Sequence, residues 1–237
     1  MAFRSFTVVA VVPARGGSKG IAGKNLRPIR GQSLVARAAR AIAESLIVDR
    51  AVCSTDDPRI ADEAKRAGLD VPDLRPAVLA TDEAKSVDVW RHAWRDIEQR
   101  DRRTYDLSIL VEPTSPLRRP DDLRRTLTAL LDNDAKAAAT VSRTPAHFTP
   151  HKTLTIGEND RIGFYLPGGA AFARRQDIPT YYHRNGVCYA ARRDTILQNG
   201  TILEDDCVAV ILDRPLVNID EPFDLEIAEL LAQREAW

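Results

Sequence analysis

A glycine-rich stretch near the start of the chain combines the residue types that bind a polyphosphate. An apolar run ends at Pro13, and residues 14–25 then hold four glycines, three cations, one hydroxyl and one carboxamide, but no acid. Glycines allow the backbone to approach a ligand closely and to turn its N–H groups toward an anion. Arg15, Lys19 and Lys24 add full positive charge. We therefore expect a polyphosphate ligand here, and the alternative is a surface loop with solvated cations.

Two known phosphate-binding motifs do not describe this stretch. A Walker A loop reads Gly-x-x-x-x-Gly-Lys-Ser/Thr, but here Ser18 replaces the first glycine and Asn25 replaces the hydroxyl residue. The dinucleotide fingerprint Gly-x-Gly-x-x-Gly also fails, because Ser18 interrupts it. The phosphate hypothesis therefore depends on the residue types of the loop rather than on either motif.

The composition indicates a folded protein that is not a general nucleic-acid binder. The chain has 237 residues, enough for one large α/β domain with an insertion, and 44% of them are hydrophobic. Lys plus Arg and Asp plus Glu both number 34, whereas nucleic-acid binders usually carry a basic excess. Cys53, Cys188 and Cys207 form no C-x-x-C zinc pattern and imply no disulfide framework. Without a signal-peptide pattern or a membrane span, we expect a cytoplasmic location.

Strand-like apolar runs alternate with amphipathic helical segments, which predicts an α/β fold with a doubly wound, mostly parallel sheet. Strands are expected at residues 8–13, 51–54, 106–111, 137–141, 186–190 and 207–212. Helices are expected to begin near Ser33, Pro58, Ser86, Asp121 and Pro222, the last with Phe223, Ile227, Leu230 and Leu231 facing inward. Ligands of such sheets bind beyond the carboxyl ends of the strands. The glycine-rich stretch, residues 54–56 and residues 112–114 all fall at that edge.

Residues 143–185 interrupt the alternation. They contain four prolines, the pair Gly168-Gly169 and three of the four histidines, whose spacing is not that of a zinc site. This stretch is too long for an ordinary connection, so we expect a functional or partner-contacting insertion. The chain is therefore predicted to be a single domain, 1–237, with an insertion at about 143–185.

Five segments in this order resemble the CMP-sialic acid synthetase (acylneuraminate cytidylyltransferase) family, whose members activate acidic sugars. The first is the glycine-rich stretch. The others are Leu-Arg-Pro-Ala-Val-Leu-Ala-Thr-Asp at 74–82, Glu-Pro-Thr-Ser-Pro-Leu-Arg at 112–118, Arg-Asn-Gly at 184–186 and Asn-Ile-Asp-Glu-Pro-Phe-Asp-Leu at 218–225. Each segment alone is a weak signal, but together they span nearly the whole chain.

The resemblance implies a Rossmann-like fold and a reaction on CTP. The anomeric hydroxyl of a 3-deoxy-2-keto sugar acid, such as sialic acid or a related nonulosonic acid, attacks the α-phosphate. Pyrophosphate leaves, with the help of Mg²⁺ or another divalent cation. The insertion resembles a segment that reaches across to a second subunit, which implies a homodimer with shared active sites.

The resemblance also implies a set of site residues. The CTP contacts are Arg15, Gly16, Gly17, Ser18, Lys24, Asn25, Arg75 and Ser86; the sugar contacts are Glu112, Lys152, Arg175 and Asn185; the metal ligands are Asp220 and Asn218. Arg15, Lys24 and Asp220 are the implied catalytic residues. These assignments agree with the chemistry, because phosphoryl-type transfer mainly requires positioning and charge neutralisation.

Two residues depart from the family pattern. Asn218 stands where the family commonly has the first acid of Asp-x-Asp, and Glu112 stands where it often has Gln. Asn218 offers a neutral oxygen to a metal, and a carboxylate at 112 would repel the carboxylate of a sugar acid. Two alternatives therefore stay open: cytidylyl transfer to a Kdo-type sugar or a phosphonate, and a CTP-binding module that has lost catalysis.

Overall fold

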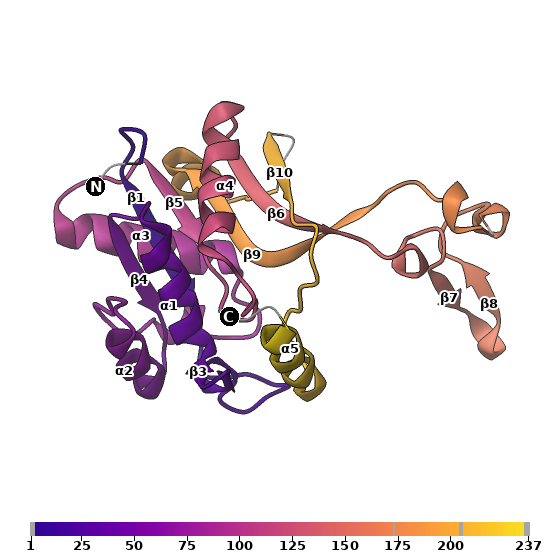
Figure 1. Cartoon of the computed structure of the whole chain (residues 1–237), viewed down its shortest axis with the longest axis horizontal. Helices are drawn as coiled ribbons and strands as arrows, with labels where there is room; N and C mark the ends of the chain where they lie inside the picture. Colours follow the sequence, from indigo (N-terminus) through magenta and orange to yellow (C-terminus); the bar gives the residue numbers. More distant parts are fainter. Residues whose placement is uncertain (1–2, 173, 204–205, 235–237) are drawn as a thin grey trace.

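The computed structural model of the chain describes residues 3–172, 174–203 and 206–234. Its centre is a six-stranded sheet with the spatial order β10 (Cys207–Ile211), β6 (Ala137–Arg143), β9 (Tyr182–Arg192), β5 (Leu107–Leu110), β1 (Val8–Pro13) and β4 (Arg50–Ser54) (Figure 1). Strand β9 runs antiparallel to both of its neighbours, whereas the other adjacent pairs are parallel. The predicted mostly parallel sheet is therefore confirmed.

Side chains of β1 alternate between two hydrophobic cores, one on each face of the sheet. Val8, Ala10 and Val12 belong to the core shared with α1 (Leu34–Ser45), α2 (Pro58–Arg66) and α4 (Pro120–Asp132). Val9 and Val11 belong to the opposite core, with α3 (Ser86–Asp101). Because both faces are covered, β1 is a continuous apolar run in the sequence. None of the helices in the described ranges has the length and apolarity that a bilayer crossing requires.

Local capping explains why the helices begin where the sequence predicts. The Ser33 hydroxyl accepts a hydrogen bond from the backbone N–H of Ala36 at 3.1 Å, so α1 starts immediately after it. The Asp57 carboxylate accepts from the N–H of Arg59 at 2.9 Å, and Pro58 occupies the first position of α2. Because these caps involve only residues within three positions of each other, the sequence predicts where α1 and α2 begin.

The inner face predicted for the last helix, α5 (Pro222–Arg234), is confirmed only in part: of the residues expected to face inward, Leu231 packs against a small core. The helix buries Ala228 and Ala232, whereas the side chains of Phe223 and Leu230 are exposed. The two alanines belong to the same small core. Small residues allow the helix to pack closely, so the apolar character of the larger ones identified the packed face only in part.

Between β6 and β9 the chain leaves the body as a long arm (Figure 1). At its base Ser142 pairs with His183 and Arg143 with Tyr182, so the two strands continue outward as an antiparallel ribbon. The arm carries a hairpin made of β7 (Leu154–Ile156) and β8 (Ile162–Phe164). Strand β9 is therefore longer than the predicted strand at 186–190.

Candidate active site

A cavity of about 470 Å³ lies at the carboxyl edge of the sheet, where loops follow β1, β4 and β5. Nine of the predicted site residues line it: Arg15, Ser18, Lys24, Asn25, Arg75, Ser86, Glu112, Asn218 and Asp220. They come from segments up to two hundred positions apart in the sequence, and the fold brings them to one place. The edge itself follows from the parallel strands, whose carboxyl ends lie on the same side.

The glycine-rich loop forms one wall of the cavity. Its last part is a short 3-10 turn, Lys24–Leu26, which begins after Gly23 in the left-handed conformation (φ 63°). The buried Asn25 side chain donates from Nδ2 to the Arg15 carbonyl at 2.9 Å, and this bond closes the loop. Arg15, Lys19 and Lys24 all line the cavity. The loop therefore presents its three cations to one space.

Two of the loop glycines assigned to CTP, Gly16 and Gly17, lie outside the described cavity lining. The N–H of Gly16 donates to Asp56 Oδ1 at 2.9 Å, and a Cβ at this position would lie 2.7 Å from the Asp57 Cβ. Gly16 thus permits the close approach of the loop that follows β4. Its contact to CTP stays a prediction.

Arg75 and Ser86 line a second part of the cavity. The buried guanidinium of Arg75 donates to both the carbonyl and the hydroxyl of Ser54 and to the carbonyl of Leu79. Burial lowers the pKa of Arg75, while the nearby Asp56 carboxylate partly offsets this effect. Ser86 is the first residue of α3. Arg75 therefore both lines the cavity and braces the carboxyl end of β4.

Glu112, Asn218 and Asp220 form the third wall. The N–H of Ile219 donates to the Thr114 carbonyl at 2.8 Å and joins the two segments that carry them. Burial raises the pKa of the Glu112 carboxyl, although the cations Arg118, Arg184 and Lys24 act in the opposite direction. The Lys24 ammonium donates to the Ile219 carbonyl at 2.7 Å and pairs with Asp220 Oδ1 at 3.2 Å. Lys24 thus connects the cationic wall to the acidic one.

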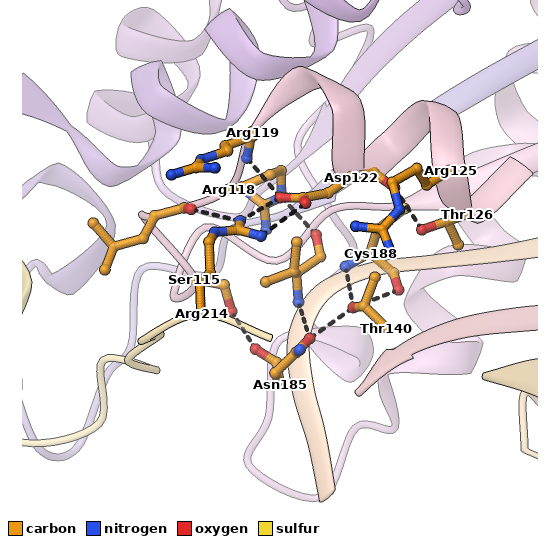
Figure 2. Close-up of polar contacts among 12 residues, drawn as sticks. Ser115, Arg118, Arg119, Asp122, Arg125, Thr126, Thr140, Asn185, Cys188 and Arg214 are labelled. Carbon is orange, nitrogen blue, oxygen red and sulfur yellow. Dashed lines mark hydrogen bonds and ion pairs between the residues drawn. The ribbon is translucent and has the colours of Figure 1, made fainter. Parts of the chain in front are cut away.

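Behind Glu112 lies a buried polar network (Figure 2). The fully buried Arg118 guanidinium donates to the carbonyls of Val187 at 2.5 Å, Glu112 at 2.6 Å and Gly186 at 3.3 Å. Burial lowers the pKa of Arg118 to about 10. Because these carbonyls belong to the end of β5 and to the middle of β9, the guanidinium ties the two segments together.

Asn185 belongs to this network. Its Oδ1 accepts from the Thr140 hydroxyl at 2.6 Å and from the Val187 N–H at 3.2 Å, and its Nδ2 donates to the Ser142 hydroxyl at 3.1 Å. Figure 2 shows the side chain pointing toward Thr140 within the protein, and Asn185 is outside the described cavity lining. Asn185 therefore shapes the turn in β9 behind Glu112, and its sugar contact stays a prediction.

Lys152 and Arg175, the remaining predicted sugar contacts, lie in the arm and are not among the described residues lining the cavity. Arg175 instead lines a separate cavity of about 560 Å³ in the arm, with Arg143 and Thr180. The fold of one chain thus brings six of the eight predicted CTP residues together with the acidic wall, whereas Lys152 and Arg175 lie elsewhere.

Asp220 and Asn218 fit a divalent cation whose remaining ligands would be water and phosphate oxygens. Both side chains line the cavity, and Asn218 Nδ2 lies 3.4 Å from Asp220 Oδ2. No group of three or more His, Cys, Asp and Glu side chains able to hold a metal occurs among the described residues. A carboxylate and an amide oxygen suit Mg²⁺, which is usually bound by one or two protein carboxylates.

Some residues of the site were not assigned a contact from the sequence. Lys19, Asp82 and Thr114 line the cavity, and Gly186 lies against the Glu112 carboxylate. Lys19 was visible as a loop cation, and the other three belong to segments that carried the resemblance. The resemblance of these segments was the available signal, but a sequence match does not show which side chains contact each other in the cavity.

Several known proteins similar to this chain have names that describe cytidylyl transfer or CMP-sugar synthesis. The family model described as cytidylyltransferase matches residues 9–206. The chain is 30% identical to the CMP-N,N'-diacetyllegionaminic acid synthase of Legionella pneumophila, covering 95% of this chain and 96% of that protein. It is 29% identical to the pseudaminic acid cytidylyltransferase of Campylobacter jejuni, covering 94% and 95%. A solved CMP:2-keto-3-deoxy-manno-octonic acid synthetase complexed with CTP has the same fold, with a TM-score of 0.70, 21% identity and coverage of 97% and 99%.

Proposed function

Because the chain belongs to the cytidylyltransferase family, we propose that it transfers the cytidylyl group of CTP to a nonulosonic acid. The anomeric oxygen forms a bond to the α-phosphorus while the bond to the bridging oxygen of pyrophosphate breaks. The hydroxyl loses its proton, and the products are a CMP-sugar and pyrophosphate. The names of the similar proteins support a sugar acid of the sialic, legionaminic or pseudaminic type as acceptor.

One observation carries the proposal: a single cavity joins a three-cation loop to a wall of acidic and amide side chains. The cations would bind the triphosphate and offset the charge that develops on the departing pyrophosphate. Arg15 can grip two phosphate oxygens at once, whereas Lys24 acts as a point charge. Arg75 and Ser86, which line another part of the cavity, would bind the cytidine. Glu112 would accept hydrogen bonds from hydroxyl or amide N–H groups of the acceptor.

We include Mg²⁺, or a similar divalent cation, in this proposal, held by Asp220 and Asn218. When bound, it would neutralise phosphate charge and polarise the oxygens of the reacting phosphoryl group. The pair of Lys24 with Asp220 Oδ1 would keep this carboxylate turned toward the loop before the nucleotide binds. The neutral amide of Asn218 would make the metal site weaker than one with two acids.

We further propose that two copies of the chain share their active sites through the arms. The arm exposes Phe148, Ile156, Ile162 and Tyr165, which is an unusual concentration of apolar side chains for a solvated surface. Lys152 and Arg175 lie on the same arm, away from the cavity of their own chain. In a dimer they would meet the carboxylate of the sugar acid.

The free thiols of all three cysteines also suit the reducing cytoplasm that we propose as the location.

The test offers CTP and Mg²⁺ with a panel of acidic sugars: N-acetylneuraminic, legionaminic, pseudaminic and Kdo-type acids. We expect release of pyrophosphate and a product with the mass of a CMP-nonulosonate. Turnover of only the Kdo-type acid would instead identify a Kdo-type sugar as the acceptor. Binding of CTP with no product from any sugar would overturn the acceptor class and leave the nucleotide site intact.

A further inference from the structure

The carboxylate of Asp82 forms ion pairs with two of the three loop cations. Its Oδ1 lies 2.7 Å from Arg15 Nη2, and its Oδ2 lies 2.7 Å from Lys19 Nζ. Arg15 also donates from Nη1 to the carbonyl of Thr81 at 2.9 Å. Hydrogen bonds from Lys19 and then Arg15 lower the pKa of Asp82, so the carboxylate is ionised. The segment around Asp82 is thereby fastened to the glycine-rich loop.

These contacts lie inside the cavity rather than behind it. Arg15, Lys19, Thr81 and Asp82 all belong to its lining. The third loop cation, Lys24, is paired with Asp220. Each cation that could bind a triphosphate therefore already has an internal carboxylate partner in the free protein.

We propose that Asp82 is an internal competitor of the nucleotide, which the triphosphate displaces from Arg15 and Lys19 when it binds. This inference rests on the proposed function, because it assumes that the loop binds the CTP triphosphate. A phosphate oxygen bound to the same guanidinium and ammonium would lie close to the Asp82 carboxylate, and the two anions repel each other. The nucleotide can therefore occupy the loop fully only after Asp82 has moved away.

The exposure of these side chains argues that Asp82 is a competitor rather than a structural brace. The Lys19 side chain is 80% exposed and that of Asp82 is 36% exposed. An ion pair this exposed contributes little to holding its partners in place. By contrast, the Asp122–Arg214 pair, whose side chains are 3% and 13% exposed, has the geometry of a brace. The Asp82 contacts can therefore exchange with solvent anions at small cost.

Displacement of Asp82 would also affect the part of the cavity that Arg75 and Ser86 line. Asp82 lies between the 3-10 turn Ala77–Leu79, whose Leu79 carbonyl accepts from Arg75, and Ser86 at the start of α3. Both Arg75 and Ser86 are on the side where we place the cytidine. Release of the carboxylate would free this connecting segment to adjust while the base enters. Nucleotide entry and segment movement would thus be one event.

The test compares equilibrium binding of CTP and of cytidine, in the presence of Mg²⁺, to the wild-type chain and to Asp82→Asn. The variant keeps the size of the side chain but removes its charge. We expect CTP to bind roughly two- to fivefold more tightly to the variant, the range that an exposed ion pair can supply. Cytidine, which has no phosphate, should show no change. The matched control is Asp121→Asn, which removes the same charge from an exposed pair with Arg124 outside the described cavity lining.

Unchanged or weaker CTP binding by Asp82→Asn would overturn the proposal, and weaker binding would make Asp82 a brace for the loop. An equal gain in Asp121→Asn would also overturn it, because net charge would then explain the effect. Titration with inorganic tripolyphosphate should reproduce the CTP difference. If the predicted difference appears but no sugar acid is converted, the acceptor assignment fails and the role of Asp82 stands. If the wild-type chain binds neither CTP nor tripolyphosphate, both fail.

Discussion

The α-carbon of Gly186 lies directly against the carboxylate of Glu112. A Cβ at position 186 would lie 2.6 Å from Glu112 Oε2 and 2.8 Å from the Ser115 hydroxyl, distances that real side chains do not tolerate. Gly186 also has a φ of +68°, in the region that favours glycine. The position in the middle of β9 is therefore restricted twice, once by backbone conformation and once by the neighbouring carboxylate.

Gly186→Ala should displace the Glu112 carboxylate from its place on the acceptor wall. We expect the KM for the sugar acid to rise roughly 10- to 100-fold, because small misplacements in a site are costly, while the Kd for CTP stays nearly constant. Steady-state kinetics and CTP titration measure the two quantities. Gly31→Ala is the control: φ there is +75°, but nothing lies within 4 Å of the added Cβ. A similar loss in both variants would assign the effect to backbone strain.

Lys24→Ala should weaken CTP binding about 10- to 100-fold, because a hydrogen bond to a charged group contributes about 1.5–3 kcal/mol. Calorimetric titration of CTP checks this value. Lys65→Ala removes an exposed lysine at the end of α2 and should leave the affinity unchanged. CTP binding by Lys24→Ala at the wild-type affinity would remove this cation from the nucleotide site.

Asp220→Asn should abolish turnover that depends on Mg²⁺, since it removes the one carboxylate that we assign to the metal. Asn218→Asp should have the opposite effect and lower the Mg²⁺ concentration needed for half-maximal rate, because a second carboxylate binds the cation more strongly. Rates measured over a series of Mg²⁺ concentrations distinguish the two. Undiminished activity of Asp220→Asn at ordinary Mg²⁺ would place the metal elsewhere.

Glu112→Gln should change the dependence of stability on pH. Burial raises the pKa of Glu112 in the folded state, so this group's contribution to stability is fully present below its unfolded pKa. The contribution is lost as the pH rises through the folded pKa. Since glutamine does not ionise, the variant should be more stable relative to wild type at pH 7 than at pH 4. Urea unfolding at both pH values measures the free energy of unfolding of the variant relative to wild type. A larger relative stability of the variant at pH 4 than at pH 7 would contradict the prediction.

The buried Asp122–Arg214 pair should be a major contributor to stability. Arg214 donates to the carboxylate at 3.0 Å and 2.5 Å, and Asp122 also caps α4 by accepting from the Arg119 N–H. Removing one partner leaves a buried charge unpaired, so Arg214→Ala should cost about 3–5 kcal/mol in urea unfolding. Arg66→Ala breaks an exposed pair with Glu63 and should cost less than about 1 kcal/mol.

The limits of sequence reasoning are clearest where side chains from distant segments meet. Asp82 belongs to the 74–82 segment that carries the family resemblance. Its contact with Arg15, however, joins residues 67 positions apart and has no local signal in the sequence. The hydrogen bonds that Asn185 makes with Thr140 and Ser142 also have no local signal, and its predicted sugar contact stays untested. In α5 the larger apolar residues predicted the inner face only in part: Leu231 packs inward, but Phe223 and Leu230 are exposed and two alanines make the close contact.

The sequence by itself determined the order of the main-sheet strands and the α-helices along the chain, the starts of α1 and α2, and the edge of the sheet where the site lies. These features depend on the alternation of apolar residues, on caps within three positions and on the direction of parallel strands. Only the tertiary structure decided which charges neutralise one another, that Gly186 makes room for Glu112, and that Lys152 and Arg175 lie away from the cavity of their own chain. Such relationships arise from packing between distant segments, which no local pattern encodes.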